Sequence, residues 1–185
     1  MLKENYLTEN IPISLSNYTS LQVISIGHNN LTGLIPLELG LLQRLDYLAV
    51  ESNKLENTIP PSLGNCSLLT VLFLGDNSTM SWRIPHELGK LRELIQLSIY
   101  GPTNILGMIP YEIGNCNKLE WLDLGSNKIQ GSIPMSIFQL HLSHLFLYKN
   151  DISGNIREAI VNLSQLIQLD LGGNKFSSVI PKAIT

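Results

Sequence analysis

The chain has 185 residues, 44% of them hydrophobic and 15% charged, so it is long and apolar enough to fold around a sizeable core. Its formal net charge is −3 and its 12 Lys and Arg residues are scattered, which argues against nucleic-acid binding. The sequence contains neither an apolar run of membrane-spanning length nor, at its start, the apolar core of a signal peptide, so on its own it is expected neither to be exported nor anchored.

An isoleucine followed by a proline recurs along the chain at intervals of 23 to 25 residues, and seven of the nine prolines stand in such pairs. A fixed period of this length predicts a solenoid, in which each repeat needs a neighbour above and below to bury its apolar edge. The pairs are Ile11-Pro12, Ile35-Pro36, Ile59-Pro60, Ile84-Pro85, Ile109-Pro110, Ile133-Pro134 and Ile180-Pro181, and Ile156-Arg157 stands where one further pair would fall.

We expect residues 1–185 to form a single solenoid. A partial repeat covers residues 1–20 and contains Asn5, Leu7 and Ile11, while the last repeat stops at Thr185 before its coil is finished. The full repeats begin at Leu21, Leu45, Leu69, Leu94, Leu119, Leu142 and Leu166. Without polar caps the terminal coils would expose apolar edges, so fraying is expected at both ends.

Each repeat begins with a short alternating stretch, such as Leu45 to Val50, which predicts a strand. Stacked repeats would join these strands into one parallel sheet. An asparagine follows most of the strands, and its amide can both donate and accept hydrogen bonds in a tight turn. We interpret these asparagines as a structural ladder: Asn29, Asn53, Asn77, Asn127, Asn150 and Asn174.

The two cysteines, Cys66 and Cys116, occupy the same repeat position, where other repeats have a leucine such as Leu42. They lie two coils apart, about 10 Å at the usual strand spacing, which is beyond the reach of a disulfide. We therefore interpret them as buried thiols that fill the core, and not as a redox or metal site.

The repeat that begins at Leu21 shows the whole pattern. Apolar residues precede its asparagine, and a Gly-x-Ile-Pro segment and further apolar residues follow it. The pattern residues are Leu21, Ile24, Ile26, Asn29, Leu31, Gly33, Ile35, Pro36, Leu39, Gly40 and Leu42. This pattern resembles the plant-type leucine-rich repeat and covers essentially the whole chain. The resemblance implies an α/β-class solenoid, a right-handed superhelix with a parallel sheet on its concave face and irregular or 3₁₀ turns on its convex face. A second short strand near the Gly-x-Ile-Pro segment is also implied.

Members of this family include the ectodomains of plant receptor-like serine/threonine kinases, receptor-like proteins without a kinase, and secreted inhibitors of cell-wall polygalacturonases. Their secreted ectodomains carry terminal caps with paired cysteines, which this sequence lacks. The chain is accordingly interpreted as an internal fragment or a truncated gene product.

No sequence motif indicates catalysis. A phosphate-binding loop, the kinase His-Arg-Asp and Asp-Phe-Gly sequences, Gly-x-Ser-x-Gly and His-Glu-x-x-His are all missing from the sequence. The four histidines, His28, His86, His141 and His144, have no metal-ligand spacing. We expect no enzyme activity, cofactor or metal in this chain, and any kinase would lie in a C-terminal domain outside it.

Strand alternation predicts which side chains face the concavity: those two, four, six and seven residues after each starting leucine. Six of the twelve aromatic residues fall on these positions, an enrichment of about threefold. We predict a groove for a peptide or protein ligand, lined by Tyr47, Phe73, Tyr100, Trp121, Asp123, His144, Phe146 and Tyr148. Glu51, Asp123, Asp170 and Lys149 would orient the ligand. The alternative is that these rings only pack against one another across the sheet.

Two consecutive repeats are one residue longer than their neighbours, in the stretches from Asn77 to Ile84 and from Tyr100 to Gly107. Their bulges should adjoin, and Trp82 with Arg83 would form a lateral contact patch. A neutral loop insertion is the alternative.

Glycosylation sequons occur at five asparagines: Asn17, Asn30, Asn65, Asn77 and Asn162. We predict modification at all of them except Asn77, which belongs to the ladder. Asn17, Asn65 and Asn162 share one repeat position on the convex side, where a glycan would leave the groove open.

Our leading hypothesis is a recognition module from the extracellular side of a plant receptor-like kinase or receptor-like protein. It would bind a peptide or protein in signalling or defence and then recruit a leucine-rich repeat co-receptor. The alternative is a secreted inhibitor of a cell-wall-degrading enzyme. An ice-binding solenoid is disfavoured, because the inner positions vary from coil to coil. No contact of this segment with nucleic acid or membrane is expected.

Overall fold

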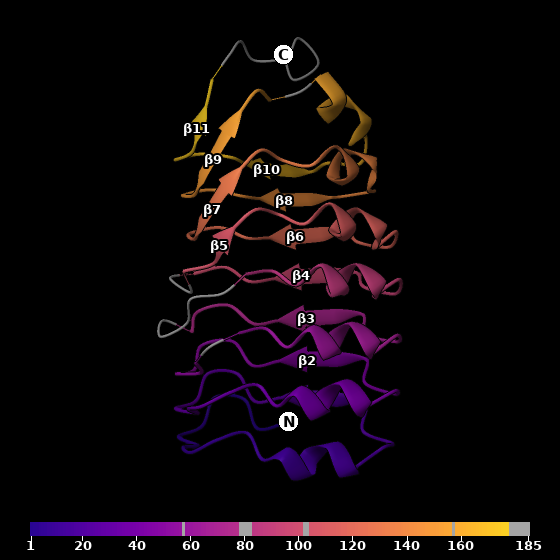
Figure 1. Ribbon diagram of the computed structural model, residues 1–185, viewed down its shortest axis with the longest axis vertical. Coiled ribbons are helices and arrows are strands. Elements are labelled where there is room, and N and C mark those ends of the chain that lie inside the picture. The colour runs from indigo at the N-terminus through magenta and orange to yellow at the C-terminus, as the bar shows by residue number, and fades with distance from the viewer. Residues whose placement is uncertain (57, 78–82, 102–103, 157, 178–185) are drawn as a thin grey trace.

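The computed structural model describes residues 1–56, 58–77, 83–101, 104–156 and 158–177. The chain winds into a stack of similar coils, and Figure 1 shows the colours following one another in order along the stack. Each of the coils that begin at Leu21 to Leu142 contributes a three-residue strand and, further along, a 3₁₀ helix of five residues. The predicted solenoid is confirmed.

Seven strands form the larger sheet, and every pairing in it is parallel. The strands are β1 (Val23–Ser25), β2 (Tyr47–Ala49), β3 (Val71–Phe73), β4 (Gln96–Ser98), β6 (Trp121–Asp123), β8 (His144–Phe146) and β10 (Gln168–Asp170). The register sets equivalent residues of successive repeats side by side, for example Leu48 beside Leu72. Each concave-face position therefore forms a row along the stack.

A second parallel sheet of four short strands runs beside the first, as the family resemblance implies. Its strands are β5 (Leu106–Gly107), β7 (Lys128–Gly131), β9 (Asp151–Gly154) and β11 (Lys175–Phe176), which all precede or enter the Ile-Pro region of their coils. Toward the N-terminus the corresponding segments make single bridges only, such as Asn10 with Thr32. The second sheet thus belongs to the later coils among the described residues.

The 3₁₀ helices begin directly after the Ile-Pro pairs. They are η1 (Ile13–Asn17), η2 (Leu37–Leu41), η3 (Pro61–Asn65), η4 (His86–Lys90), η5 (Tyr111–Asn115), η6 (Met135–Gln139) and η7 (Glu158–Asn162). The proline before each of the first six has φ between −70° and −60°, and its carbonyl accepts the first bond of the turn. In the described ranges no helix has the length and apolarity that a membrane crossing requires.

A single apolar core fills the space inside the coils. The middle residue of each central strand points inward, and Leu48, Leu72 and Leu122 have no exposed surface. Cys66 and Cys116 are buried in the same core as free thiols, and burial raises the pKa of both to about 11. Their interpretation as core residues is confirmed.

The asparagines after the strands connect consecutive coils through their side chains. Asn53 is typical: its Oδ1 accepts from the Leu31 backbone N–H at 3.0 Å, and its Nδ2 donates to the carbonyls of Ile26, Val50 and Glu51. Asn29, Asn77, Asn127, Asn150 and Asn174 make the corresponding bonds. Each amide thus satisfies backbone groups of its own turn and of the preceding coil.

The turn that presents each of these asparagines uses a left-handed backbone. The residue seven positions after the starting leucine has positive φ in every full repeat, as in His28 (55°), Ser52 (52°) and Lys149 (50°). Simple strand alternation assumes an extended backbone, so it does not give the direction of the side chain at this left-handed position.

Candidate ligand-binding site

The side chains predicted to face the concavity leave the larger sheet on the side opposite the core. In β6, Leu122 is fully buried while Trp121 and Asp123 are half-buried on the other side. The same alternation holds in β3 and β8. We call this outer side of the sheet, together with the residues six and seven positions after each starting leucine, the concave face.

A hollow of about 400 Å³ lies on the concave face, over the coils that begin at Leu21 to Leu119. It is lined by His28, Glu51, Phe73, Gln96, Ser98, Tyr100, Trp121 and Asp123. Every one of these residues occupies a position that strand alternation assigned to this face. The hollow thus draws on five consecutive coils.

Aromatic clusters stand on both sides of the hollow. Trp121 stacks on His144 with ring centroids 4.3 Å apart, and Phe146 meets the Trp121 ring edge-on at 5.3 Å. Toward the N-terminus, Tyr47 and Phe73 form an edge-to-face pair at 6.2 Å. Some rings therefore pack on one another, as the alternative interpretation held, yet Phe73 and Trp121 also line the hollow.

The structure divides the predicted ligand-binding residues into three groups. Phe73, Tyr100, Trp121 and Asp123 line the hollow. Tyr47 contacts Phe73, and His144 and Phe146 contact Trp121, so these three rings touch residues that line the hollow. Tyr148 lies apart, over Gly125 of the preceding coil.

Sequence reasoning missed four residues of the hollow as ligand contacts: His28, Glu51, Gln96 and Ser98. Glu51 was considered only for orienting a ligand. The prediction gave most weight to aromatic side chains, and all four of these residues are non-aromatic or, in the case of His28, were assigned to the surface.

The concave face alternates between glycine and large side chains in one row. Six residues after the starting leucine, successive coils have Gly27, Glu51, Gly75, Tyr100, Gly125, Tyr148 and Gly172. A Cβ at Gly27 would lie 2.6 Å from the Glu51 carboxyl carbon, and one at Gly125 would lie 2.3 Å from the Tyr148 ring. The glycines therefore make room for the large side chain of the next coil, a signal that can be read in the sequence.

Several positions expected to be open on this face are in fact buried. Ala49 is 1% exposed and Ser98 is 8% exposed, although both point outward from the sheet. Both are register neighbours of Phe73 on the two adjacent strands, so the larger ring covers them. Strand alternation gives the face on which these side chains lie, but the size of the neighbouring side chain decides their exposure.

The hollow is acidic. Burial raises the pKa of Tyr100, and the negative charges of Asp76, Glu51 and Asp123 raise it further. Burial also raises the pKa of Asp123, against the hydrogen bond that its Oδ1 accepts from the Gly125 backbone N–H at 3.0 Å. A ligand in this hollow would therefore meet negative charge as well as aromatic rings.

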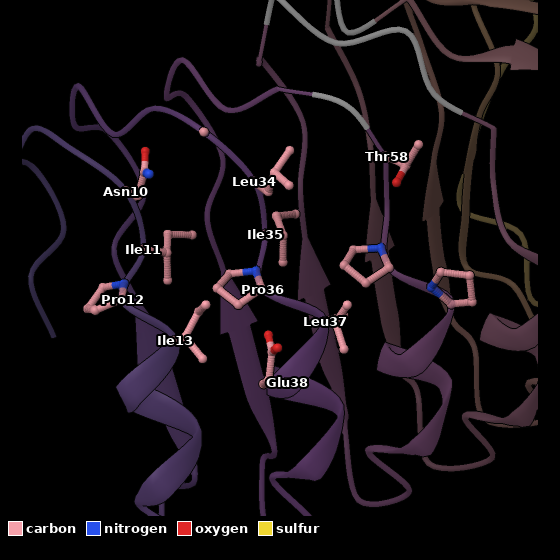
Figure 2. A pocket seen from close by; sticks show the side chains of 13 residues that line it. Asn10, Ile11, Pro12, Ile13, Leu34, Ile35, Pro36, Leu37, Glu38 and Thr58 are labelled. Atoms are coloured by element: carbon pink, nitrogen blue, oxygen red, sulfur yellow. The ribbon is translucent and has the colours of Figure 1, made fainter.

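A larger hollow of about 660 Å³ lies on the flank, between the Ile-Pro segments of the first coils. Figure 2 shows Ile11, Pro12, Ile35 and Pro36 side by side above the 3₁₀ helices. Its lining is mainly apolar, and Leu34 and Leu37 nearby are more than half exposed. Among its described lining residues Glu38 is the one that carries a charge, so this hollow offers apolar contact area and few groups that would orient a ligand.

The lateral patch predicted at Trp82 and Arg83 is described only in part, because Trp82 lies outside the described residues. Arg83 is exposed, and its side chain passes within 3.7 Å of the place where a Cβ at Gly107 would be. The two lengthened repeats therefore adjoin at this point.

The sequon asparagines differ in exposure. Asn17, Asn65 and Asn162 each end a 3₁₀ helix and are exposed, whereas Asn30 is half-buried and Asn77 is fully buried in its ladder bonds. Within the described ranges no three acidic, histidine or cysteine side chains gather in a way that would hold a metal ion.

Comparison with known proteins agrees with this architecture. The model of the Leucine Rich Repeat family matches residues 20–42, 118–140 and 165–185. Receptor-like protein 39 of Arabidopsis thaliana is 35% identical over 94 residues, which are 50% of this chain and 11% of that protein. The chain thus spans about a tenth of the length of this curated relative.

Two solved receptor structures superpose on nearly the whole chain. The plant peptide hormone receptor RGFR1 in complex with RGF2 has 38% identity and a TM-score of 0.93, covering 97% of this chain and 29% of that one. The Arabidopsis receptor kinase HAESA in complex with the peptide hormone IDA and the co-receptor SERK1 has 27% identity and a TM-score of 0.81, covering 94% and 33%. The chain thus contains leucine-rich repeats, and it resembles receptor-like protein 39 over half of its length and the ectodomains of plant receptor kinases over nearly all of it.

Proposed function

We propose that this chain is a non-enzymatic recognition module that binds an extended peptide, or an extended segment of a protein, on its concave face. The observation that carries the proposal is the hollow between Phe73, Tyr100 and Trp121, where aromatic side chains and carboxylates converge from five coils. Aromatic anchors in a concave, partly charged site are typical of specific recognition surfaces. The peptide complexes of the similar receptors support this choice.

The dimensions of the hollow suit an extended peptide. Five coils at the usual strand spacing of about 4.8 Å span about 19 Å, which is the length of about six extended residues. The rings of Phe73, Tyr100 and Trp121 come from three consecutive coils, and the carboxylates of Glu51 and Asp123 come from the second and the fifth of the five coils. A peptide of this length would meet both kinds of contact.

The same proposal places the chain on the extracellular side of a plant cell, in signalling or defence. Glycans at the exposed Asn17, Asn65 and Asn162 would stand at the ends of 3₁₀ helices, and Asn30 is a further candidate, whereas Asn77 should stay unmodified. A co-receptor would join after the peptide, a proposal supported by the HAESA complex, which holds the co-receptor SERK1 together with the peptide hormone.

The proposal can be tested with a phage library of random 12-residue peptides, selected on the immobilised 185-residue chain. Peptides that bind the hollow should lose about tenfold or more in affinity on the variant Trp121→Ala, because an aromatic anchor of an interface often contributes more than about 1.4 kcal/mol. Isothermal titration calorimetry measures the affinity.

A matched control is Tyr111→Ala, which also removes a large aromatic side chain, one that is 61% exposed on η5. This variant should bind the selected peptides as the unmodified chain does. Peptides that bind both variants with unchanged affinity, while circular dichroism shows both folded, would exclude the concave hollow as the recognition site.

A further inference from the structure

Glu51 is the most deeply buried charged side chain of the concave hollow. It follows β2 by two residues, and the residue is only 8% exposed. Its carboxylate lies against Gly27 of the preceding coil, where a Cβ would come within 2.6 Å of Oε1 and 2.8 Å of Oε2. The glycine therefore provides the space that holds this carboxylate on the concave face.

The carboxylate lacks the hydrogen bonds that its burial calls for. Oε2 is enclosed and accepts none from the part of the chain that the structure describes. The basic nitrogens near it among the described residues are His28 Nε2 at 3.8 Å and Lys3 Nζ at 4.0 Å from Oε1, which are too far for hydrogen bonds. A buried carboxylate without donors is costly, so a donor from outside would be strongly favoured.

The surroundings of Glu51 indicate which donor would fit. Phe73 and Tyr100 line the same hollow, and Asp123 adds a second carboxylate further along. Ser52 directs its hydroxyl to Asp76, so that nearby acid is already occupied. A planar cation can stack on aromatic rings while it donates several hydrogen bonds, and the guanidinium group combines both properties.

We propose that Glu51 and the adjacent rings form a subsite for an arginine side chain of the bound peptide. This inference rests on the proposed function, since the arginine arrives on a peptide in the same hollow. The guanidinium would supply the N–H donors that the Glu51 carboxylate lacks, and Phe73 or Tyr100 would cover its face.

The test uses two synthetic hexapeptide pools with acetylated and amidated ends. Five positions are degenerate mixtures of uncharged residues, and the third is fixed as arginine in one pool and as citrulline, its uncharged analogue, in the other. Fluorescence polarisation compares their binding to the 185-residue chain. We expect the arginine pool to bind about tenfold more tightly, as charge-assisted hydrogen bonds to a partly buried carboxylate provide.

The variant Glu51→Gln should abolish this preference, because it keeps the shape of the side chain and removes its charge. Glu56→Gln is the matched control: it removes the same charge from an exposed residue of the same coil, and the preference should persist. Glu51→Gln should also melt at the same or a higher temperature, because it removes an incompletely bonded charge.

Three results would overturn the inference. Equal binding of both pools would reject the arginine subsite and leave peptide binding in place. If Glu51→Gln still prefers the arginine pool, the arginine binds another acid. If that variant also melts at a lower temperature, Glu51 has a purely structural role. Binding of neither pool would reject the proposed function and the subsite together.

Discussion

On the concave face, burial and a hydrogen bond act in opposite directions on the pKa of Asp123. Its side chain is half-buried beside Trp121, yet it keeps the hydrogen bond from the Gly125 backbone N–H. Burial raises the pKa of Asp123, this hydrogen bond lowers it, and the charge of Asp170 raises it again, with a net upward shift from 3.8. The ionised carboxylate is therefore less favourable in the folded chain than in the unfolded one.

We predict that Asp123→Asn raises the free energy of unfolding at pH 7. The asparagine Oδ1 can still accept from Gly125, while the cost of the charge disappears. Because the pKa of the folded state is above the unfolded value, the folded chain binds the proton more tightly, and the penalty fades as pH falls through the raised pKa. Below about pH 3 both side chains are neutral and the two proteins should be equally stable.

Urea unfolding at a series of pH values, followed by circular dichroism, measures this difference. A variant that is less stable at pH 7, or a difference that stays constant down to pH 3, would contradict the electrostatic account of Asp123.

At the scale of the structural element, the turn after each strand depends on its asparagine. Asn150 is 8% exposed, and its side chain bonds the Ile129 backbone N–H and the carbonyls of Leu124 and Leu147. Backbone hydrogen bonds also join the coils at this turn, such as that from the Asn150 N–H to the Gly173 carbonyl, but the groups that the amide bonds would be left without this partner in a buried place. The loss of one amide therefore affects two coils.

We predict that Asn150→Ala lowers the free energy of unfolding by at least roughly 1 to 3 kcal/mol, the usual cost of leaving a buried polar group without its partner. Chemical denaturation measures the change. Asn117→Ala, at an exposed asparagine, is the control and should change stability by less than about 0.5 kcal/mol. Equal effects of the two substitutions would contradict the role of the ladder.

The position of a coil in the stack decides what its core residues contribute. Leu122 and Leu169 occupy equivalent places on β6 and β10, but Leu122 is fully buried and Leu169 is only partly buried. In a solenoid each coil receives its packing from its immediate neighbours. The same leucine should therefore contribute differently in the two strands.

We predict that Leu122→Ala costs about 2 to 5 kcal/mol, the range for a fully buried leucine, and that Leu169→Ala costs clearly less. Urea unfolding of the two variants provides the comparison. Matching losses would show that the coil of β10 is as tightly packed as the central coils, contrary to its exposure.

Most of the fold could be predicted from the sequence, because the period of the Ile-Pro pairs and the apolar positions of a repeat are local signals. Pro36 and Asn53 act within a coil or between adjacent coils, so their roles follow from a single repeat. The site was harder to predict. Whether Ala49 is exposed depends on Phe73 in the next coil, and the burial of Glu51 depends on Gly27 in the preceding one. Contacts between neighbours 24 residues apart decide such details.

In the row of alternating glycines and large side chains on the concave face, a large side chain occurs once every two coils, whereas the backbone repeats every coil. Glu51, Tyr100 and Tyr148 therefore stand about 10 Å apart along the stack, given the usual strand spacing of about 4.8 Å. An extended peptide advances about 3.3 Å per residue, so every third residue of a peptide lying along the stack would meet one of them. The solenoid would thus contact every third residue of its ligand at this row. Inserting one residue into the peptide would move its later side chains away from these positions.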